Sequence, residues 1–197
     1  MKKVTFLLLI ATTFSVLVSC NKKSDDTNAS DSVAATSASA ESISYAVDTN
    51  NSVINWTGSK QTGKHSGILR LSDGTVFVKD GKVEGGTFVI DMNTIEVTDL
   101  KPGDGKESLE GHLKGTAAKE SDHFFNVTKY PTGKFEITGV QLEHGKSTVE
   151  GNLTLKETTK NVKFPAIVTV DDNKVSIISD AFIIDRTQWK VNYGSKS

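Results

Sequence analysis

The sequence predicts an all-β protein whose strands form either an antiparallel barrel of about eight strands or a sandwich. After residue 42, runs of β-branched and aromatic residues are separated by Gly, Asn and Asp clusters. Apolar and polar residues alternate within many of these runs, as they do in strands that bury one face. Strand character disappears between Asp104 and Asn126, where one or two short helices are expected.

The expected strands are short and follow one another at regular spacing. They are Ser44–Asp48, Ser52–Ser59, Ser66–Ser72, Thr75–Lys79, Lys82–Met92, Gly133–Val140, Ser147–Lys156, Asn161–Val170, Lys174–Ile184 and Gln188–Tyr193. Three dipeptides, Asp73-Gly74, Asp80-Gly81 and His144-Gly145, predict tight turns between them. A barrel of this size either fills its interior with side chains or holds one small ligand.

The helical insertion separates the strands before it from those after it. Leu109, Leu113 and the Phe124-Phe125 pair are mixed there with Glu, Lys and Ala. Tyr130-Pro131 is expected to end the insertion, because a residue before proline is pushed out of the helical region. A segment of this length that carries its own apolar residues should fold over the sheet, as a lid or plug.

The amino terminus has the pattern of a lipoprotein leader. Lys2 and Lys3 precede an apolar stretch, and Leu17-Val18-Ser19 leads into Cys20, which is the single cysteine of the chain. This run resembles the bacterial lipobox, which implies cleavage after residue 19 and a lipid on Cys20. We therefore expect a signal peptide over residues 1–19 and a lipid-anchored flexible linker over 20–42. Residues 43–197 are expected to form one domain.

Composition excludes some partners of this domain. The chain has 23 Lys and Arg against 24 Asp and Glu, for a net charge of −1, and has no basic stripe. A nucleic-acid partner is therefore not expected. The membrane is the expected partner, through Cys20, in a cell envelope and on either the periplasmic or the surface face of the outer membrane.

Several motifs occur in an order that resembles one bacterial envelope family. They are Tyr45-Ala46-Val47-Asp48 with Ser52-Val53-Ile54-Asn55-Trp56, then His112-Leu113 with Asp122-His123-Phe124-Phe125-Asn126-Val127 and Lys129-Tyr130-Pro131, then Gly151-Asn152-Leu153-Thr154-Leu155 with Thr159-Lys160-Asn161-Val162, and finally Ile184-Asp185-Arg186 with Tyr193-Gly194. Together they resemble the YceI-like, polyisoprenoid-binding family. The resemblance implies a lipocalin-like antiparallel barrel with an apolar channel. The implied ligand is an isoprenoid quinone, a polyprenyl lipid or a similar molecule, and no other cofactor is required.

The candidate ligand-binding residues are apolar side chains expected to line such a channel. They are Trp56, Phe77, Phe88, Ile90, Phe124, Phe125, Phe135, Ile137, Phe182 and Trp189. Arg186 has two interpretations, contact with a lipid headgroup or an ion pair with another strand, and the ion pair is favoured.

No catalytic residue is expected, because the sequence has no nucleophile elbow and no His-Glu-x-x-His spacing. His112 and His123 are the pair that would be tested for a metal. The leading hypothesis is an envelope lipoprotein that holds a long apolar lipid for carriage, storage or stress protection. The alternatives are a metal-dependent envelope enzyme and a surface interaction protein without a ligand.

Overall fold

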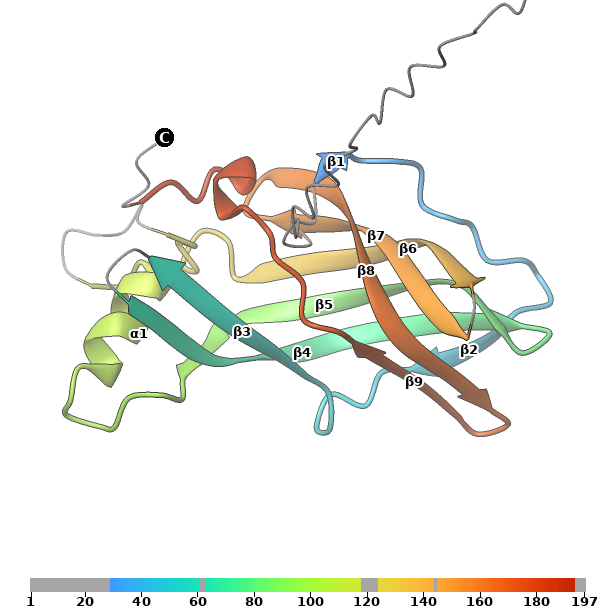
Figure 1. Ribbon diagram of the computed structural model, residues 1–197, viewed down its shortest axis with the longest axis horizontal. Coiled ribbons are helices and arrows are strands. Elements are labelled where there is room, and N and C mark those ends of the chain that lie inside the picture. The colour runs from blue at the N-terminus through green and yellow to red at the C-terminus, as the bar shows by residue number, and fades with distance from the viewer. Residues whose placement is uncertain (1–28, 61–62, 118–123, 144, 194–197) are drawn as a thin grey trace, which may run out of the picture.

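A computed structural model describes residues 29–60, 63–117, 124–143 and 145–193 (Figure 1). Nine strands form one antiparallel sheet in the order β1-β8-β7-β6-β5-β4-β2, with β3 also paired to β4 and β9 also paired to β8. The element bounds are β1 Ser30–Asp31, β2 Ile43–Ala46, β3 Val53–Lys60, β4 Gly63–Lys79, β5 Lys82–Val97, α1 Lys106–Lys114, β6 Thr132–Glu143, β7 Lys146–Leu155, β8 Thr158–Asp171, β9 Lys174–Ser179 and the 3₁₀ helix η1 Arg186–Trp189. The predicted all-β class with a helix between mid-chain strands is confirmed.

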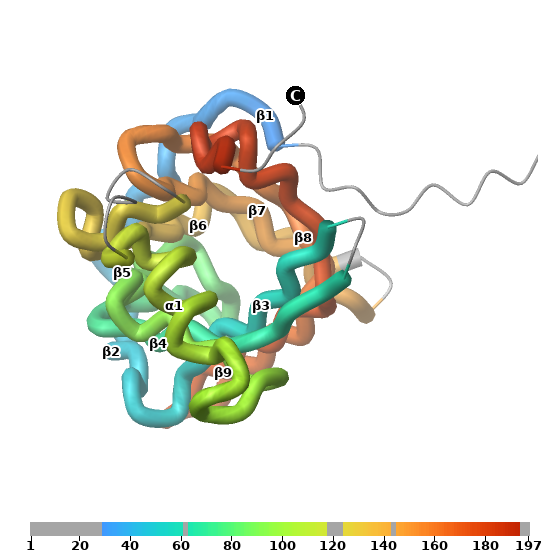
Figure 2. The backbone as a smooth tube through the Cα atoms, turned by 90° about the vertical axis from the view of Figure 1, so that its left-hand side faces the viewer, coloured from blue at the N-terminus to red at the C-terminus, as the bar shows by residue number. Residues whose placement is uncertain are grey.

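The sheet curls into a barrel whose two edges are not paired by a strand ladder in the described residues. Figure 2, viewed toward the end that carries α1, shows the strands arranged as a ring. One edge is formed by β3 and β2, which pair with successive halves of β4, and the other by β1 and β9, which pair with successive parts of β8. The Tyr45 hydroxyl of β2 donates to the carbonyl of Asp172, at the β8–β9 turn, over 3.3 Å. This contact bridges the two edges at one end.

Strand β4 corrects the predicted turn at Asp73-Gly74. The sequence predicts two strands separated there, whereas the structure has one strand of 17 residues. A register shift between Leu71 and Asp73 marks a bulge, and Gly74 continues the ladder opposite Phe88. A side chain at Gly74 would lie 2.7 Å from both the Thr87 carbonyl and Val47. The glycine therefore lets β5 and Val47 pack closely against β4, and the chain continues as a strand where a turn was expected.

The last predicted strands are wrong in their extent. Strand β9 ends at Ser179, not Ile184, because the next ladder position on β8 is Pro165. Pro165 accepts a bond from the Asp180 amide at 2.9 Å but has no N–H to return, so the ladder ends there. The predicted strand Gln188–Tyr193 is instead η1 and the residues after it. Asp185 starts η1, because its carboxylate accepts the Thr187 amide at 2.9 Å.

Helix α1 covers nine residues of the predicted helical insertion. It ends at Gly115, whose φ of 70° is left-handed, and not at the Tyr130-Pro131 pair as expected. The Gly115 and Thr116 amides donate to the carbonyls of His112 and Gly111. Glycine adopts this conformation without a steric penalty, and so it ends the helix. Among the described residues, no helix has the length and apolarity needed to cross a bilayer.

Residues 30–42 lie along the outside of the barrel, although the sequence predicts a flexible linker there. β1 pairs with β8 at Asn161 and Lys160, and the buried Asn152 side chain of β7 then bonds both the carbonyl and the amide of Val33. Further along, the Thr36 hydroxyl donates to the Thr138 carbonyl of β6 over 2.7 Å. This segment, which we call the N-terminal strap, therefore crosses the outer face before it enters β2 (Figure 1). The leader and the anchor of the predicted lipoprotein fall outside the described residues.

Candidate functional site

The inward face of the barrel carries apolar side chains that keep part of their surface accessible. Fully buried residues such as Ile137, Val149 and Val162 form a core. Around it lie half-buried side chains that point inward from most of the strands: Ile54, Leu69, Leu71, Phe88, Phe135, Leu153, Val168, Val170, Val175 and Ile177. Their exposure on the inner side of a curled sheet means that side chains do not fill the space between them completely.

An aromatic row crosses this inner face. The ring centroids of Phe88 and Phe135 are 6.3 Å apart, and those of Phe135 and Phe164 are 5.7 Å apart. The row ends with Phe182, which stacks on Phe164 at 4.4 Å with the planes 8° apart. These rings come from β5, β6, β8 and the segment after β9. They give the interior a continuous wall of flat, rigid and apolar surfaces.

Two glycines make room for the large rings. A side chain at Gly151 of β7 would lie 2.3 Å from the Phe135 ring, and one at Gly67 of β4 would lie 2.5 Å from the Trp56 ring. Each ring therefore lies flat against the backbone of a neighbouring strand. The Trp56 indole N–H is satisfied by the Ile68 carbonyl at 3.2 Å. Packing of this kind keeps both rings close to the wall of the barrel.

The structure divides the predicted lining residues into groups. Phe88, Phe135 and Phe182 belong to the aromatic row. Trp56 lies on β3, toward the end of the barrel that carries α1. Ile90 and Ile137 face inward but are buried in the core. Phe124, Phe125 and Trp189 lie at the end that carries α1 and η1 and are discussed below.

Phe77 is a correction, because it does not face the interior. Val76 and Val78 on either side of it are buried in the core, so strand alternation turns Phe77 outward. Because a turn was expected at Asp73-Gly74, the sequence did not show which residues in the second half of β4 face inward. The row also contains Phe164, which was not among the candidates although it lies in the predicted strand Asn161–Val170.

One end of the barrel carries a pocket, and we call it the open end. A pocket of about 340 Å³ lies between the β4–β5 and β8–β9 turns, lined by Glu41, Ile43, Tyr45, Val78, Lys79, Asp80, Gly81, Val170, Asp171 and Asp172. Tyr45 and Val170 also pack against the core, so the pocket adjoins the inner face. At this end Ile43 is 62% exposed and Leu142 is 73% exposed. Exposed apolar side chains at the rim are typical of a binding site entrance.

At the opposite end, η1, the residues after it and the described part of the loop after α1 pack together into what we call the cap. Trp189 is 0% exposed, and its indole N–H donates to the Leu153 carbonyl over 2.8 Å. The Phe124 ring lies 5.3 Å from the Tyr193 ring, and the Arg186 guanidinium lies over Phe124 at 4.9 Å. Phe124 itself has a φ of 41°, which is an uncommon conformation for a residue of this size.

Arg186 holds this cap together through backbone carbonyls. It donates to the carbonyl of Val191, and to that of Tyr193 over 2.7 Å. The expected ion pair with another strand is therefore replaced, in the described part of the chain, by hydrogen bonds to its own C-terminal segment. The reason is that Arg186 begins η1 and does not lie in a strand.

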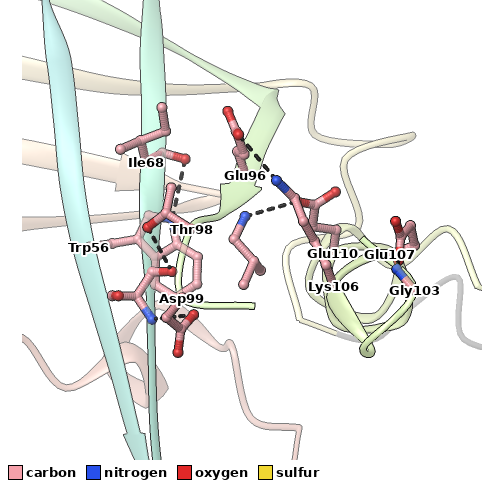
Figure 3. A network of polar contacts seen from close by, with 11 residues as sticks. Trp56, Ile68, Glu96, Thr98, Asp99, Gly103, Lys106, Glu107 and Glu110 are labelled. Carbon is pink, nitrogen blue, oxygen red and sulfur yellow. Dashed lines mark hydrogen bonds and ion pairs between the residues drawn. The ribbon is translucent and has the colours of Figure 1, made fainter. Parts of the chain in front are cut away.

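Helix α1 is fixed to the same end by a small charged network (Figure 3). The Lys106 ammonium lies 3.2 Å from the Glu96 carboxylate of β5 and 3.8 Å from that of Glu110. Glu110 also accepts the Val97 amide at 2.9 Å. Bonds to the backbone amides of Glu107 itself and of Gly103 lower the pKa of Glu107. These contacts fix the helix beside the end of β5. The lid or plug that the sequence suggested stays a prediction.

The histidines do not assemble a metal site in the residues that the structure describes, where no group of three or more possible ligands is found. The His112 ring packs edge-on against Tyr193 at 4.4 Å and against Phe124 at 5.0 Å. His123, the other member of the predicted pair, lies outside the described residues. His112 thus takes part in the aromatic packing of the cap, and sequence spacing could not have shown its contact with Tyr193.

The fold and the site together define an antiparallel β-barrel with an apolar interior, open at one end and capped at the other. The model of the YceI-like domain matches residues 45–197, and the chain belongs to this family. No curated protein matches the chain.

Solved structures with a similar fold include Burkholderia cenocepacia BcnA and a Campylobacter jejuni YCEI protein. BcnA is 16% identical with a TM-score of 0.44, and the match covers 78% of this chain and 82% of BcnA. The Campylobacter jejuni protein is 18% identical with a TM-score of 0.42, and the match covers 62% of this chain and 70% of that one. At these levels the likeness carries no argument about function.

Proposed function

We propose that this protein is an envelope lipoprotein that binds one long apolar lipid of the isoprenoid type inside its barrel, for carriage, storage or stress protection. The observation that carries the proposal is the inner face, where apolar side chains from most of the strands surround the aromatic row and remain partly exposed. A dense core would have buried them. The pocket at the open end adjoins this face through Tyr45 and Val170, which supports entry of a lipid tail there.

Burial of hydrocarbon alone is sufficient to hold such a ligand. An isoprenoid tail that hides several hundred Å² gains about 25 cal/mol per Å², or several kcal/mol, before the cost of association. The flat faces of the aromatic rings can pack against the double bonds and methyl groups of such a tail. The binding role requires no catalytic group and no cofactor beyond the lipid itself.

The anchored location rests on the sequence at Cys20. A lipid on this cysteine would tether the barrel to a membrane, which is also where an isoprenoid lipid resides. Metabolic labelling with a fatty acid analogue tests the anchor: the wild-type chain is expected to be labelled, and the Cys20→Ala variant is not. Labelling that survives the substitution would contradict the anchor without affecting the binding role.

The binding role is tested by extracting protein purified from its own membrane with organic solvent and analysing the extract by mass spectrometry. About one apolar lipid per chain is expected. The decisive variant is Ile177→Trp, because Ile177 points inward from β9 and is half-buried. The larger ring should fill space that the tail needs and reduce the amount of bound lipid.

A matched control lies at the next residue. Ile178 is 61% exposed and points to the outer face, so Ile178→Trp adds the same ring without filling the interior. Lipid content should fall in the first variant and stay at the wild-type level in the second. Equal lipid content in both variants, or no extractable lipid in the wild-type protein, would overturn the proposal.

A further inference from the structure

The N-terminal strap lies before the region matched by the family model, yet it builds part of the open end. The matched region begins at residue 45, whereas Glu41 and Ile43 both line the pocket. The wall of this pocket therefore includes side chains from outside the region that the family model matches. Their position depends on how the strap is held on the outer face of the barrel.

The strap is fixed by polar contacts on both sides of its path. Near its start, Asn152 bonds the Val33 carbonyl at 2.7 Å and the Val33 amide at 3.1 Å, in the way that a neighbouring strand would. Near its end, the Ser39 amide donates to Glu84 over 3.2 Å, and the Ser42 hydroxyl donates to the same carboxylate. These bonds lower the pKa of Glu84, and the bond from the Ser42 hydroxyl has the largest effect. Glu41 lies between Ser39 and Ser42, so its backbone is held beside the pocket, while its side chain is 77% exposed.

Glu41 changes the charge that a ligand headgroup meets. Its carboxylate lies 2.8 Å from the Lys79 ammonium, and Lys79 is the one cation among the residues that line the pocket. The other charged lining residues are the carboxylates of Asp80, Asp171 and Asp172. Lys82 pairs with Lys79 in the ladder between β4 and β5, and Lys174 pairs with Asp171 in the ladder between β8 and β9. Neither Lys82 nor Lys174 lines the pocket. An anionic headgroup would thus meet carboxylates, and the ammonium that could receive it is already paired.

We propose that the N-terminal strap makes the open end selective for lipids with an uncharged headgroup, because Glu41 pairs with Lys79 and leaves no free cation in the pocket for a phosphate. The inference rests on the proposed function and names the ligand class of the same site. A hydroxyl or quinone headgroup places no charge next to the carboxylates. A phosphate places at least one negative charge there and is repelled at low ionic strength.

The test compares two ligands with the same tail, geranylgeraniol and geranylgeranyl monophosphate, by tryptophan fluorescence titration of the delipidated full-length protein in low salt. The wild-type protein should bind the alcohol about three- to tenfold more tightly than the phosphate. Glu41→Gln frees Lys79, and it should strengthen phosphate binding by about two- to fivefold while leaving the alcohol unchanged, as for a partly exposed ion pair. Added salt should reduce the preference, because it screens exposed charges.

Glu157→Gln is the matched control, because Glu157 also pairs with a lysine, Lys129 at 3.4 Å, but at the capped end. It should leave both affinities unchanged. The inference is overturned if the wild-type protein binds the phosphate as tightly as the alcohol, or if Glu41→Gln leaves their ratio unchanged. Failure of both ligands to bind would instead overturn the proposed function, and the inference with it.

Discussion

The two ends of the barrel differ in how far their side chains are buried and in the contacts that hold them. The capped end contains the buried Trp189, the Arg186 contacts to two carbonyls and the charged network that fixes α1. The open end has a pocket, charged turns and exposed apolar side chains. Stability should therefore be concentrated at the capped end, and ligand entry at the open end. The difference shows how one barrel separates the task of closing its core from the task of admitting a ligand.

The largest effect is expected from Trp189→Ala. This change empties a fully buried site and leaves the Leu153 carbonyl without its indole donor. The free energy of unfolding should fall by about 3–5 kcal/mol, which is typical of a large aromatic residue removed from a core. Urea denaturation followed by circular dichroism measures it. A loss below about 1 kcal/mol would mean that the cap does not stabilise the barrel.

The next largest effect is expected from Arg186→Met, which keeps the aliphatic length of the side chain but removes its donors to Val191 and Tyr193. Charged hydrogen bonds contribute about 1.5–3 kcal/mol each when buried, and partial exposure reduces this, so a loss of about 2 kcal/mol is expected. The matched control is Arg70→Met, since Arg70 is the other arginine and is exposed on β4. Equal losses in the two variants would contradict the role of Arg186 in the cap.

A smaller and pH-dependent effect is expected at the start of η1. Hydrogen bonds from the Thr187 hydroxyl and then the Thr187 amide lower the pKa of Asp185. A lowered pKa in the folded state gives stability that is present above the ordinary aspartate range and is lost as the pH falls through the lowered value. Melting temperatures of wild-type and Asp185→Asn proteins should differ at neutral pH and converge in acid. A difference that is constant from neutral to acidic pH would contradict this assignment.

The smallest effect on stability is expected at the open rim. Leu142→Ser and Ile43→Ser remove apolar side chains that are already mostly exposed, so the free energy of unfolding should change by less than about 0.5 kcal/mol. Ligand uptake from vesicles, measured by the rate of fluorescence change, should nevertheless become slower. If these substitutions destabilise the protein as much as those of the cap, the comparison between the two ends fails.

Local pattern predicted most of the strands and the helix, because each depends on neighbouring residues. Phe88 and Phe135, which the sequence suggested as lining residues, lie on the inner faces of β5 and β6. The errors occur where the same short sequence is compatible with two different backbone structures. Asp73-Gly74 is a common turn pair, yet here the glycine lies in a continuous strand against a neighbouring backbone.

The C-terminal region could not be predicted for a different reason. Strand β9 ends because of Pro165 on another strand, and η1 follows because Asp185 caps it. The strap was also missed, since its Ser- and Ala-rich sequence has no core of its own. It is held by Asn152 and Glu84, which in the sequence are ordinary outward-facing strand residues.

The sequence by itself determined the β-rich class, the position of the helix and the family, because these follow from periodicity and from an ordered set of motifs. Only the tertiary structure decided which turns form the pocket, that Trp189 bonds the Leu153 carbonyl, and that Glu41 reaches Lys79. Each of these depends on residues far apart in the chain that meet when the sheet curls. No local pattern encodes the partner that a side chain finds across a barrel.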